Sequence, residues 1–207
     1  MVFEKALQPT KPAHKDSPHM PVGQEILIAL GANMDSPYGG PVETLSSALS
    51  RLPELGLAVR AVSKFYETPC FPAGAGPDYV NACAHLTAVP SPEAVLAALH
   101  QIEAEHDRKR DRRWGARSLD LDLLAIGGKV LPSLKYYQQW RDLSPEAQGR
   151  LAPEQLILPH PRLQDRGFVL VPLLDVAPDW CHPVSGQTVR QMHDALPAEA
   201  RAEVKPI

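Results

Sequence analysis

The feature that most constrains this chain is a strictly alternating stretch, Leu119 to Leu123, in which leucine and aspartate take turns. Alternation with period two predicts a β-strand with one apolar face. Asp120 and Asp122 would then lie side by side on the opposite face. Because neighbouring carboxylates repel each other, a half-buried strand would carry this pair only with a cation between them. Mg²⁺ is the leading candidate, since one or two carboxylates, water and substrate phosphates typically hold it.

The segment before this strand is strongly basic. Residues 108–117 carry an excess of five positive charges. Two solvated aspartates on a wet strand face would explain the pair by itself, but clustered cations beside it fit a polyphosphate held by both. The sequence contains neither a Walker-type loop nor a kinase Gly-rich loop. Phosphoryl or nucleotidyl transfer would therefore depend on metal and arginines.

The order of the expected elements predicts the fold. Strands are expected at 25–30, 57–68, 78–89 and 119–126, with helices at 41–52 and 91–106. The order βαββαβ predicts an α+β, ferredoxin-like fold, an antiparallel sheet with both helices on one face. The other face would be free for ligands. A wet outer face accounts for Cys83 to Thr87 in the third strand, whereas Tyr79 and Asn81 could wall a ligand pocket.

The rest of the chain is expected to form a tail, an insertion and an extension of one domain. Residues 1–22 are polar and Pro-rich and predict a flexible tail, followed by a single domain over 23–207. Gly127-Gly128 predicts a turn after which Val130-Leu131 pairs back as a hairpin. Residues 133–154 are read as an inserted helical segment. A C-terminal extension follows, in which a short helix over 188–196 closes the ordered part.

Composition bounds the partners and the compartment. The net charge is −3, so nothing in the overall charge favours nucleic acid or a membrane surface. No stretch reaches the roughly 20 apolar residues of a membrane span, and the N-terminus lacks an apolar signal segment. The three cysteines lack metal-type spacing. We expect a cytoplasmic monomer that binds small molecules, with no nucleic-acid or membrane partner.

The segment Arg113-Trp-Gly-Ala-Arg-Ser-Leu-Asp-Leu-Asp-Leu-Leu124 resembles the signature of the 6-hydroxymethyl-7,8-dihydropterin pyrophosphokinase family of folate biosynthesis. The similarity extends in family order over roughly residues 25–196. Further matching segments are Leu30-Gly-Ala-Asn33, Phe65-Tyr-Glu-Thr-Pro69, Pro77-Asp-Tyr-Val-Asn-Ala82, Ile102-Glu103, Pro159-His160 and Arg166-Gly-Phe168. Two positions depart from the family: Ala116 stands where proline is common, and Pro161 where an aromatic residue is frequent.

The resemblance implies an enzyme that moves diphosphate from ATP to the hydroxymethyl group of the dihydropterin and releases AMP, with two Mg²⁺ ions touching Asp120 and Asp122. The implied catalytic residues are Arg108, Arg117, Asp120 and Asp122. The implied pterin-binding residues are Thr68, Pro69, Phe71, Tyr79, Asn81, Trp114 and Phe168. The implied ATP-binding residues are Glu103, Arg110, Arg117, Leu123, His160 and Arg166. No convincing general base lies in the signature, so metal would lower the pKa of the substrate hydroxyl.

Plainer interpretations stand beside these assignments. Tyr79 and Phe168 read as core aromatics equally well, His160 as a turn residue, and Glu103 as a residue on a helix surface. Two other functions stay open. One is a ferredoxin-like module that binds single-stranded RNA by stacking, which tight RNA binding in EDTA would reveal. The other is a different Mg²⁺-dependent Asp-x-Asp nucleotidyl- or glycosyltransferase, which would not release AMP from ATP.

Overall fold

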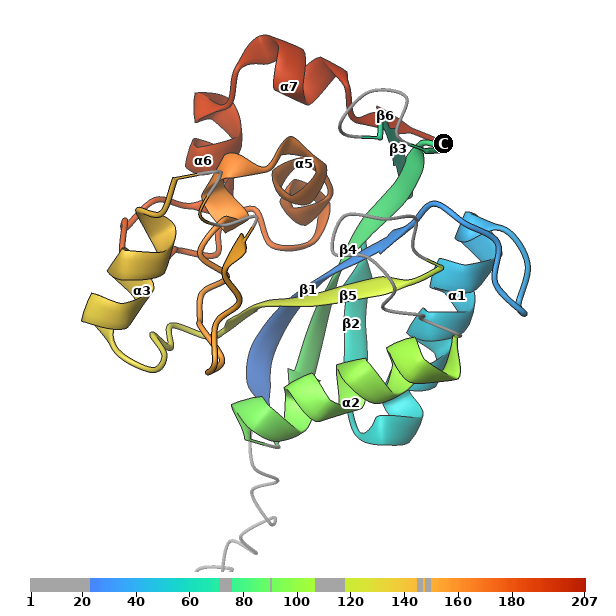
Figure 1. Ribbon diagram of the computed structural model, residues 1–207, viewed down its shortest axis with the longest axis horizontal. Helices are drawn as coiled ribbons and strands as arrows, with labels where there is room; N and C mark the ends of the chain where they lie inside the picture. Colours follow the sequence, from blue (N-terminus) through green and yellow to red (C-terminus); the bar gives the residue numbers. More distant parts are fainter. Residues whose placement is uncertain (1–22, 71–75, 90, 107–117, 145–146, 148–149) are drawn as a thin grey trace, which may run out of the picture.

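The computed structural model describes residues 23–70, 76–89, 91–106, 118–144, 147 and 150–207 (Figure 1). Its strands are β1 (Gln24–Ala32), β2 (Ala58–Val62), β3 (Tyr66–Thr68), β4 (Tyr79–Ala88), β5 (Asp120–Ile126) and β6 (Lys205–Pro206). Its α-helices are α1 (Pro41–Arg51), α2 (Pro92–Glu105), α3 (Leu134–Arg141), α5 (Gly167–Val176), α6 (Val189–Ala195) and α7 (Ala198–Ala202). Short 3₁₀ helices span Leu52–Leu55 and Leu163–Asp165.

The sheet is antiparallel, with strand order β5-β1-β4-β3-β6, and β2 also pairs with β4. Helix α1 follows β1 and helix α2 follows β4, so the predicted βαββαβ order is confirmed. The strand expected over 57–68 is interrupted at Ser63, whose backbone amide still donates to the Cys83 carbonyl at 2.9 Å but whose side chain replaces its carbonyl in the return bond. The Ser63 side-chain oxygen accepts a hydrogen bond from the Cys83 amide at 2.9 Å. The chain resumes as β3 on the same neighbour, β4.

Both predicted helices pack on one face of the sheet, where the main core forms (Figure 1). Alternate residues of each strand point into this core, as period two requires. Typical members are Ile28 in β1, Ala84 in β4 and Leu121 in β5, all buried. Helix α2 begins at the predicted Ser91 cap, whose side chain accepts from the Ala94 amide at 3.3 Å.

The opposite face of the sheet is largely covered, so the expectation of a free face is wrong for most of its length. Helices α5 and α6 pack there in a second core with Leu27, Cys83 and Ala125 (Figure 1). Cys83 is buried rather than wet, its thiol donates to the Val169 carbonyl at 3.5 Å, and burial raises its pKa. Apart from Asp175, segment 167–176 is apolar, and a helix of this composition needs cover over most of its surface.

Two further expectations change. Leu131 pairs with Leu158 through two backbone hydrogen bonds of 2.9 and 3.2 Å, so the predicted hairpin back to β5 is wrong. Order continues past Leu196, because α7 follows and β6 pairs with β3. In segment 133–154, α3 starts at its Ser133 cap. No helix in the part of the chain that the structure describes is both long and apolar enough to cross a membrane.

Candidate active site

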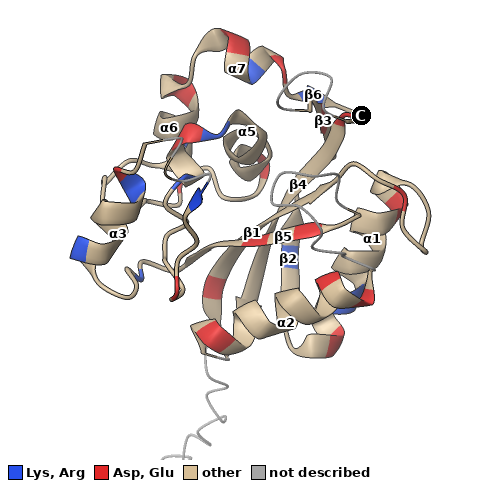
Figure 2. Cartoon of the chain, viewed as in Figure 1, with Lys and Arg blue, Asp and Glu red and all other residues tan. Residues whose placement is uncertain are grey.

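The acidic pair lies on the second sheet face, at the edge of the part that α5 and α6 cover. In β5, Leu121 and Leu123 are buried in the main core, whereas Asp120 and Asp122 are partly exposed on the other face. The alternation therefore places both carboxylates on one face, as predicted. The ribbon coloured by charge shows these acidic positions in the middle of the molecule, on β5 (Figure 2).

Strand register brings the aspartates level with residues of the two neighbouring strands. Gly31 of β1 pairs with Asp120 on one side and with Asn81 of β4 on the other. In the next row of the same face, Ala29 pairs with Asp122 and with Cys83. The second core ends at this row, and Asn81, Gly31 and Asp120 form the row beyond it. A ligand lying across β1 would therefore reach from Asn81 to the acidic pair.

The polar groups on β3 and β4 are held in fixed positions. The Asn81 side chain is 7% exposed, and its Nδ2 donates to Thr68 Oγ1 at 2.7 Å. Asn33, at the end of β1, donates from its side chain to the Pro77 carbonyl at 3.1 Å. Tyr79 is half-buried, whereas Pro69 is exposed at the end of β3. These side chains offer a rim that combines amide, hydroxyl and aromatic groups.

Helix α5 delivers two more of the predicted site residues. Arg166 precedes the helix, and its guanidinium lies 3.7 Å from the Asp122 carboxylate. The same guanidinium lies 5.5 Å from the ring centre of Phe168, which is 40% exposed. Phe168 is therefore not a plain core aromatic. Burial lowers the pKa of Arg166, although Asp122 opposes this shift.

His160 lies beside β5 as a neutral side chain. Its amide donates to the Leu124 carbonyl at 2.7 Å, and its Nδ1 accepts from the Arg162 amide at 3.1 Å. Because Nδ1 is the acceptor, the proton of the neutral ring is on Nε2. Burial, followed by the charge of Arg166, lowers the pKa of His160 to about 3. A neutral ring with its proton on Nε2 is a hydrogen-bond donor at that atom, which suits phosphate.

Glu103 is buried, so its interpretation as a helix-surface residue is wrong. Its side chain is 1% exposed, and Oε1 accepts the Leu121 amide hydrogen at 2.8 Å. Leu121 lies between the two aspartates, and β5 is the edge strand of the sheet among the strands that the structure describes. Glu103 and His160 therefore supply hydrogen-bond partners along that edge. Both contacts fix the strand that carries the carboxylates.

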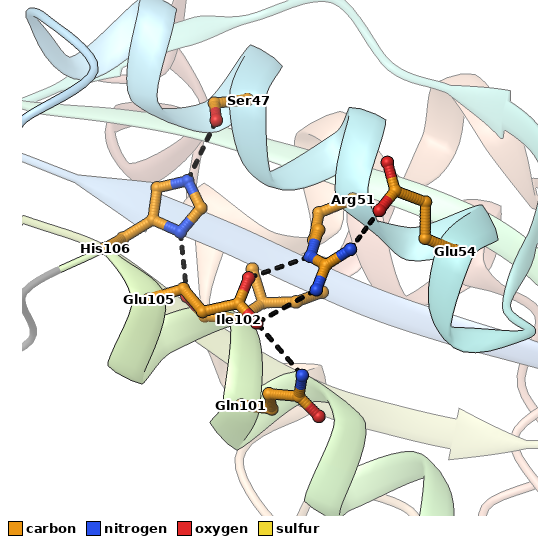
Figure 3. Close-up of polar contacts among 7 residues, drawn as sticks. All are labelled: Ser47, Arg51, Glu54, Gln101, Ile102, Glu105 and His106. Atoms are coloured by element: carbon orange, nitrogen blue, oxygen red, sulfur yellow. Dashed lines mark hydrogen bonds and ion pairs between the residues drawn. The ribbon is translucent and has the colours of Figure 1, made fainter.

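The end of α2 is anchored to α1 directly before the basic segment (Figure 3). Arg51 donates to both oxygens of Glu105 at 2.8 and 3.1 Å, which lowers the pKa of Glu105 to about 2. His106 donates from Nδ1 to the Ile102 carbonyl at 2.8 Å, so its Nε2 accepts from Ser47 at 3.1 Å. The Ser118 hydroxyl donates to the His106 carbonyl at 2.9 Å. His106 and Ser118, the described residues that flank segment 107–117, therefore lie close together, beside β5.

Several predicted residues lie outside the described part of the chain. They are Phe71, Arg108, Arg110, Trp114 and Arg117. Leu123 is described, but its buried side chain faces the main core, away from the aspartates. Sequence reasoning missed Gly31, for which a glycine inside a strand pattern was the available signal. It also missed Leu96 and His100 of α2, which line a hollow of about 460 Å³ together with Leu131 and Leu156.

The aspartate pair fits a Mg²⁺ ion by its donor chemistry. Within the described ranges, no group of three or more histidine, cysteine or acidic side chains forms a closed metal cluster. Two carboxylates on a rigid strand, beside an arginine, instead suit an ion completed by water and substrate phosphates. Asp120 and Asp122 are the residues that would hold it.

Comparisons with known proteins agree on one family. The sequence profile of the 7,8-dihydro-6-hydroxymethylpterin-pyrophosphokinase family matches residues 27–178. A 2-amino-4-hydroxy-6-hydroxymethyldihydropteridine pyrophosphokinase of Pseudomonas aeruginosa is 37% identical over 179 residues, which cover 85% of this chain and 94% of that protein. The enzyme of the same name from Synechocystis sp. is 34% identical over 182 residues, covering 87% and 80%.

Solved structures support the fold. A Plasmodium falciparum HPPK-DHPS triple mutant with pteroate matches with a TM-score of 0.60 and 14% identity, over 91% of this chain and 48% of that chain. The chain thus spans about half the length of that solved protein. At this identity the likeness shows a shared fold.

Proposed function

Since the chain belongs to the 7,8-dihydro-6-hydroxymethylpterin-pyrophosphokinase family, we propose that it transfers the β,γ-diphosphate of ATP to the hydroxymethyl group of 6-hydroxymethyl-7,8-dihydropterin. In this reaction the substrate hydroxyl oxygen bonds to the β-phosphorus of ATP. The bond from that phosphorus to the α,β-bridging oxygen breaks, and AMP leaves. The product, the pterin diphosphate, belongs to folate biosynthesis. The family and the named relatives do not favour the RNA-binding or other-transferase alternatives.

The observation that carries this proposal is the row Asn81–Gly31–Asp120 on the second sheet face, at the edge of the part that α5 and α6 cover. A flat heterocycle bound at the Asn81 end would place a substituent near the acidic pair at the other end. Asn81 would read the hydrogen-bonding edge of the pterin, with Thr68 and Pro69 beside it. Tyr79 and Phe168 would flank the ring faces, since aromatic pockets suit flat heterocycles. From the sequence, Phe71 and Trp114 are proposed to complete this pocket.

Asp120 and Asp122 are proposed to hold two Mg²⁺ ions against the phosphates of ATP. Bound there, Mg²⁺ would neutralise phosphate charge and lower the pKa of the attacking hydroxyl. Arg166 already lies beside Asp122 and would contact the transferred phosphates, and His160 would donate from its Nε2–H. Arg108, Arg110 and Arg117 are proposed from the sequence to stabilise the charge that develops during transfer.

The nucleoside end of ATP is proposed to lie on the α2 side of β5. The hollow of about 460 Å³ lies there, and its apolar lining comes from α2, segment 131–132 and Leu156. Its polar lining residues are Glu93, His100, Glu154 and Gln155. Its volume is within the usual range of small-molecule pockets. The buried side chain of Leu123 faces the same side of β5. His100 lines the hollow, and Glu103, one turn further along α2, contacts the strand of the acidic pair. Helix α2 therefore connects the hollow with the acidic pair.

The decisive experiment is an assay of AMP release from ATP with Mg²⁺ and 6-hydroxymethyl-7,8-dihydropterin. We expect AMP and pterin diphosphate in equal amounts, and neither when the pterin or Mg²⁺ is omitted. ADP or inorganic pyrophosphate as the product would overturn the proposal. We further propose that the enzyme acts as a cytoplasmic monomer without nucleic-acid partners. Sedimentation at several concentrations and an RNA-binding assay in EDTA test those points.

A further inference from the structure

Gly31 has no backbone reason to be glycine. Its φ lies outside the left-handed region, and the residue is buried near the end of β1, paired with Asn81 on one side and Asp120 on the other. Any residue adopts such an extended conformation. Glycine in a strand interior weakens the strand, and it often marks a place where another group approaches the backbone closely.

The group that approaches is the Asn81 carboxamide. A Cβ at Gly31 would lie 3.0 Å from Asn81 Oδ1 and 4.0 Å from a ring carbon of Tyr79. The first distance is closer than a Cβ normally tolerates. The carboxamide has little room to withdraw, because it is 7% exposed and Thr68 Oγ1 holds its Nδ2 at 2.7 Å. Asn81 Oδ1 therefore lies over the space that the missing side chain leaves on β1.

We infer that Gly31 is a specificity-determining position that acts through Asn81. With Nδ2 held by Thr68, Asn81 Oδ1 stays over Gly31 as an acceptor for the amino and ring N–H donors of a 2-amino-4-oxo heterocycle. A side chain at Gly31 rotates the carboxamide away from this position. The enzyme then loses discrimination for that edge of the substrate, whereas the ATP side of the site is unaffected. This inference rests on the proposed function, because it assumes that the pterin binds beside Asn81.

The test is a double-mutant cycle with Gly31→Ala, Asn81→Ala and the combined variant. The readout is the dissociation constant of 6-hydroxymethyl-7,8-dihydropterin, measured by fluorescence with a non-hydrolysable ATP analogue present. We expect Gly31→Ala to weaken pterin binding roughly tenfold, the usual effect of losing one or two hydrogen bonds. In the Asn81→Ala background the same change should have an effect of less than about twofold, because there is no carboxamide left to displace. The KM for ATP should stay at the wild-type value.

Gly128→Ala is the matched control, since a Cβ there meets nothing within 4 Å and its φ is not left-handed. It should leave pterin binding unchanged. If Gly31→Ala unfolds more easily, adding Asn81→Ala should restore its unfolding midpoint, because the clash is then removed. An undiminished effect of Gly31→Ala without the Asn81 side chain would overturn the inference, and so would wild-type affinity in Gly31→Ala. In either case wild-type enzyme that binds pterin and releases AMP leaves the proposed function intact; failure of wild-type enzyme in both assays refutes that function itself.

Discussion

Glu103 is the residue whose replacement should separate positioning of the acidic strand from binding of substrates. Its Oε1 accepts the Leu121 amide hydrogen at 2.8 Å, in a place where the side chain is 1% exposed. Glu103→Leu keeps a side chain of similar size but removes the acceptor. The buried amide is then left without that partner, which costs about 1–3 kcal/mol. Glu103→Gln keeps an oxygen in the same place and should lose less than about 1 kcal/mol.

The same loss should be visible in metal dependence. Leu121 lies between Asp120 and Asp122, so a loosened strand lets the two carboxylates drift from their common face. The arrangement with both carboxylates on one face would then be about 1–3 kcal/mol less stable. In that case the Mg²⁺ concentration for half-maximal activity rises roughly 5- to 150-fold. The dissociation constant of the pterin, which is proposed to bind beside β3 and β4, should stay near the wild-type value.

Urea unfolding and Mg²⁺ titration of the AMP assay measure these two effects. Glu103→Gln is the control, since its amide oxygen still accepts the hydrogen bond. Wild-type unfolding free energy and Mg²⁺ dependence in Glu103→Leu would refute the reasoning. If Glu103→Gln were as damaging as Glu103→Leu, the buried charge, and not the acceptor, would be what positions β5.

Three other outcomes are expected. Asp122→Ala should reduce turnover at least roughly a hundredfold while the thermal unfolding midpoint stays close to wild type, because the carboxylate is partly exposed; near-normal turnover would contradict its role. Tyr66→Phe removes a hydroxyl that donates to Asp175 at 2.8 Å and should lower the unfolding free energy by about 1–3 kcal/mol in urea titrations. Because its pKa is lowered to about 3, His160 should stay neutral in the folded protein, as imidazole NMR signals without a transition between pH 5 and 8 would show. The stability it contributes is then complete above about pH 6.5, the unfolded value, and declines as the pH falls from there toward 3.

The parts of the fold that sequence predicted have an unambiguous period or a cap. Strand β5 alternates, and β4 alternates over its whole length. Helix α2 begins with Ser91 and Pro92, a cap followed by a first-turn proline. Each signal is local, so it can be recognised without knowledge of the tertiary partners. The acidic pair was predictable for the same reason, because side chains two residues apart on a strand point to the same face.

The cover on the second face was not predictable, because its signals are not local. Helix α5 is apolar except for Asp175, so its sequence does not indicate which face meets the sheet. Strand β6 has two residues and exists because β3 offers an edge. Cys83 was assigned to a wet face because its neighbours His85 and Thr87 are polar. The packing of α5 over β4 shows instead that Cys83 lies in the covered part of this face.

Glu103 and Gly31 show why a site is harder to read from sequence than a fold. The partner of Glu103 is a backbone amide, which leaves no trace in the pattern of side chains. The reason for Gly31 is an oxygen fifty residues away in sequence, brought level by the register of β1 and β4. Glu103 holds the strand of the aspartates, which belong to the signature, and Gly31 is inferred to act on Asn81, which belongs to the matching segment 77–82. The signature residues do the chemistry, and their geometry depends on residues that carry no chemical signal of their own.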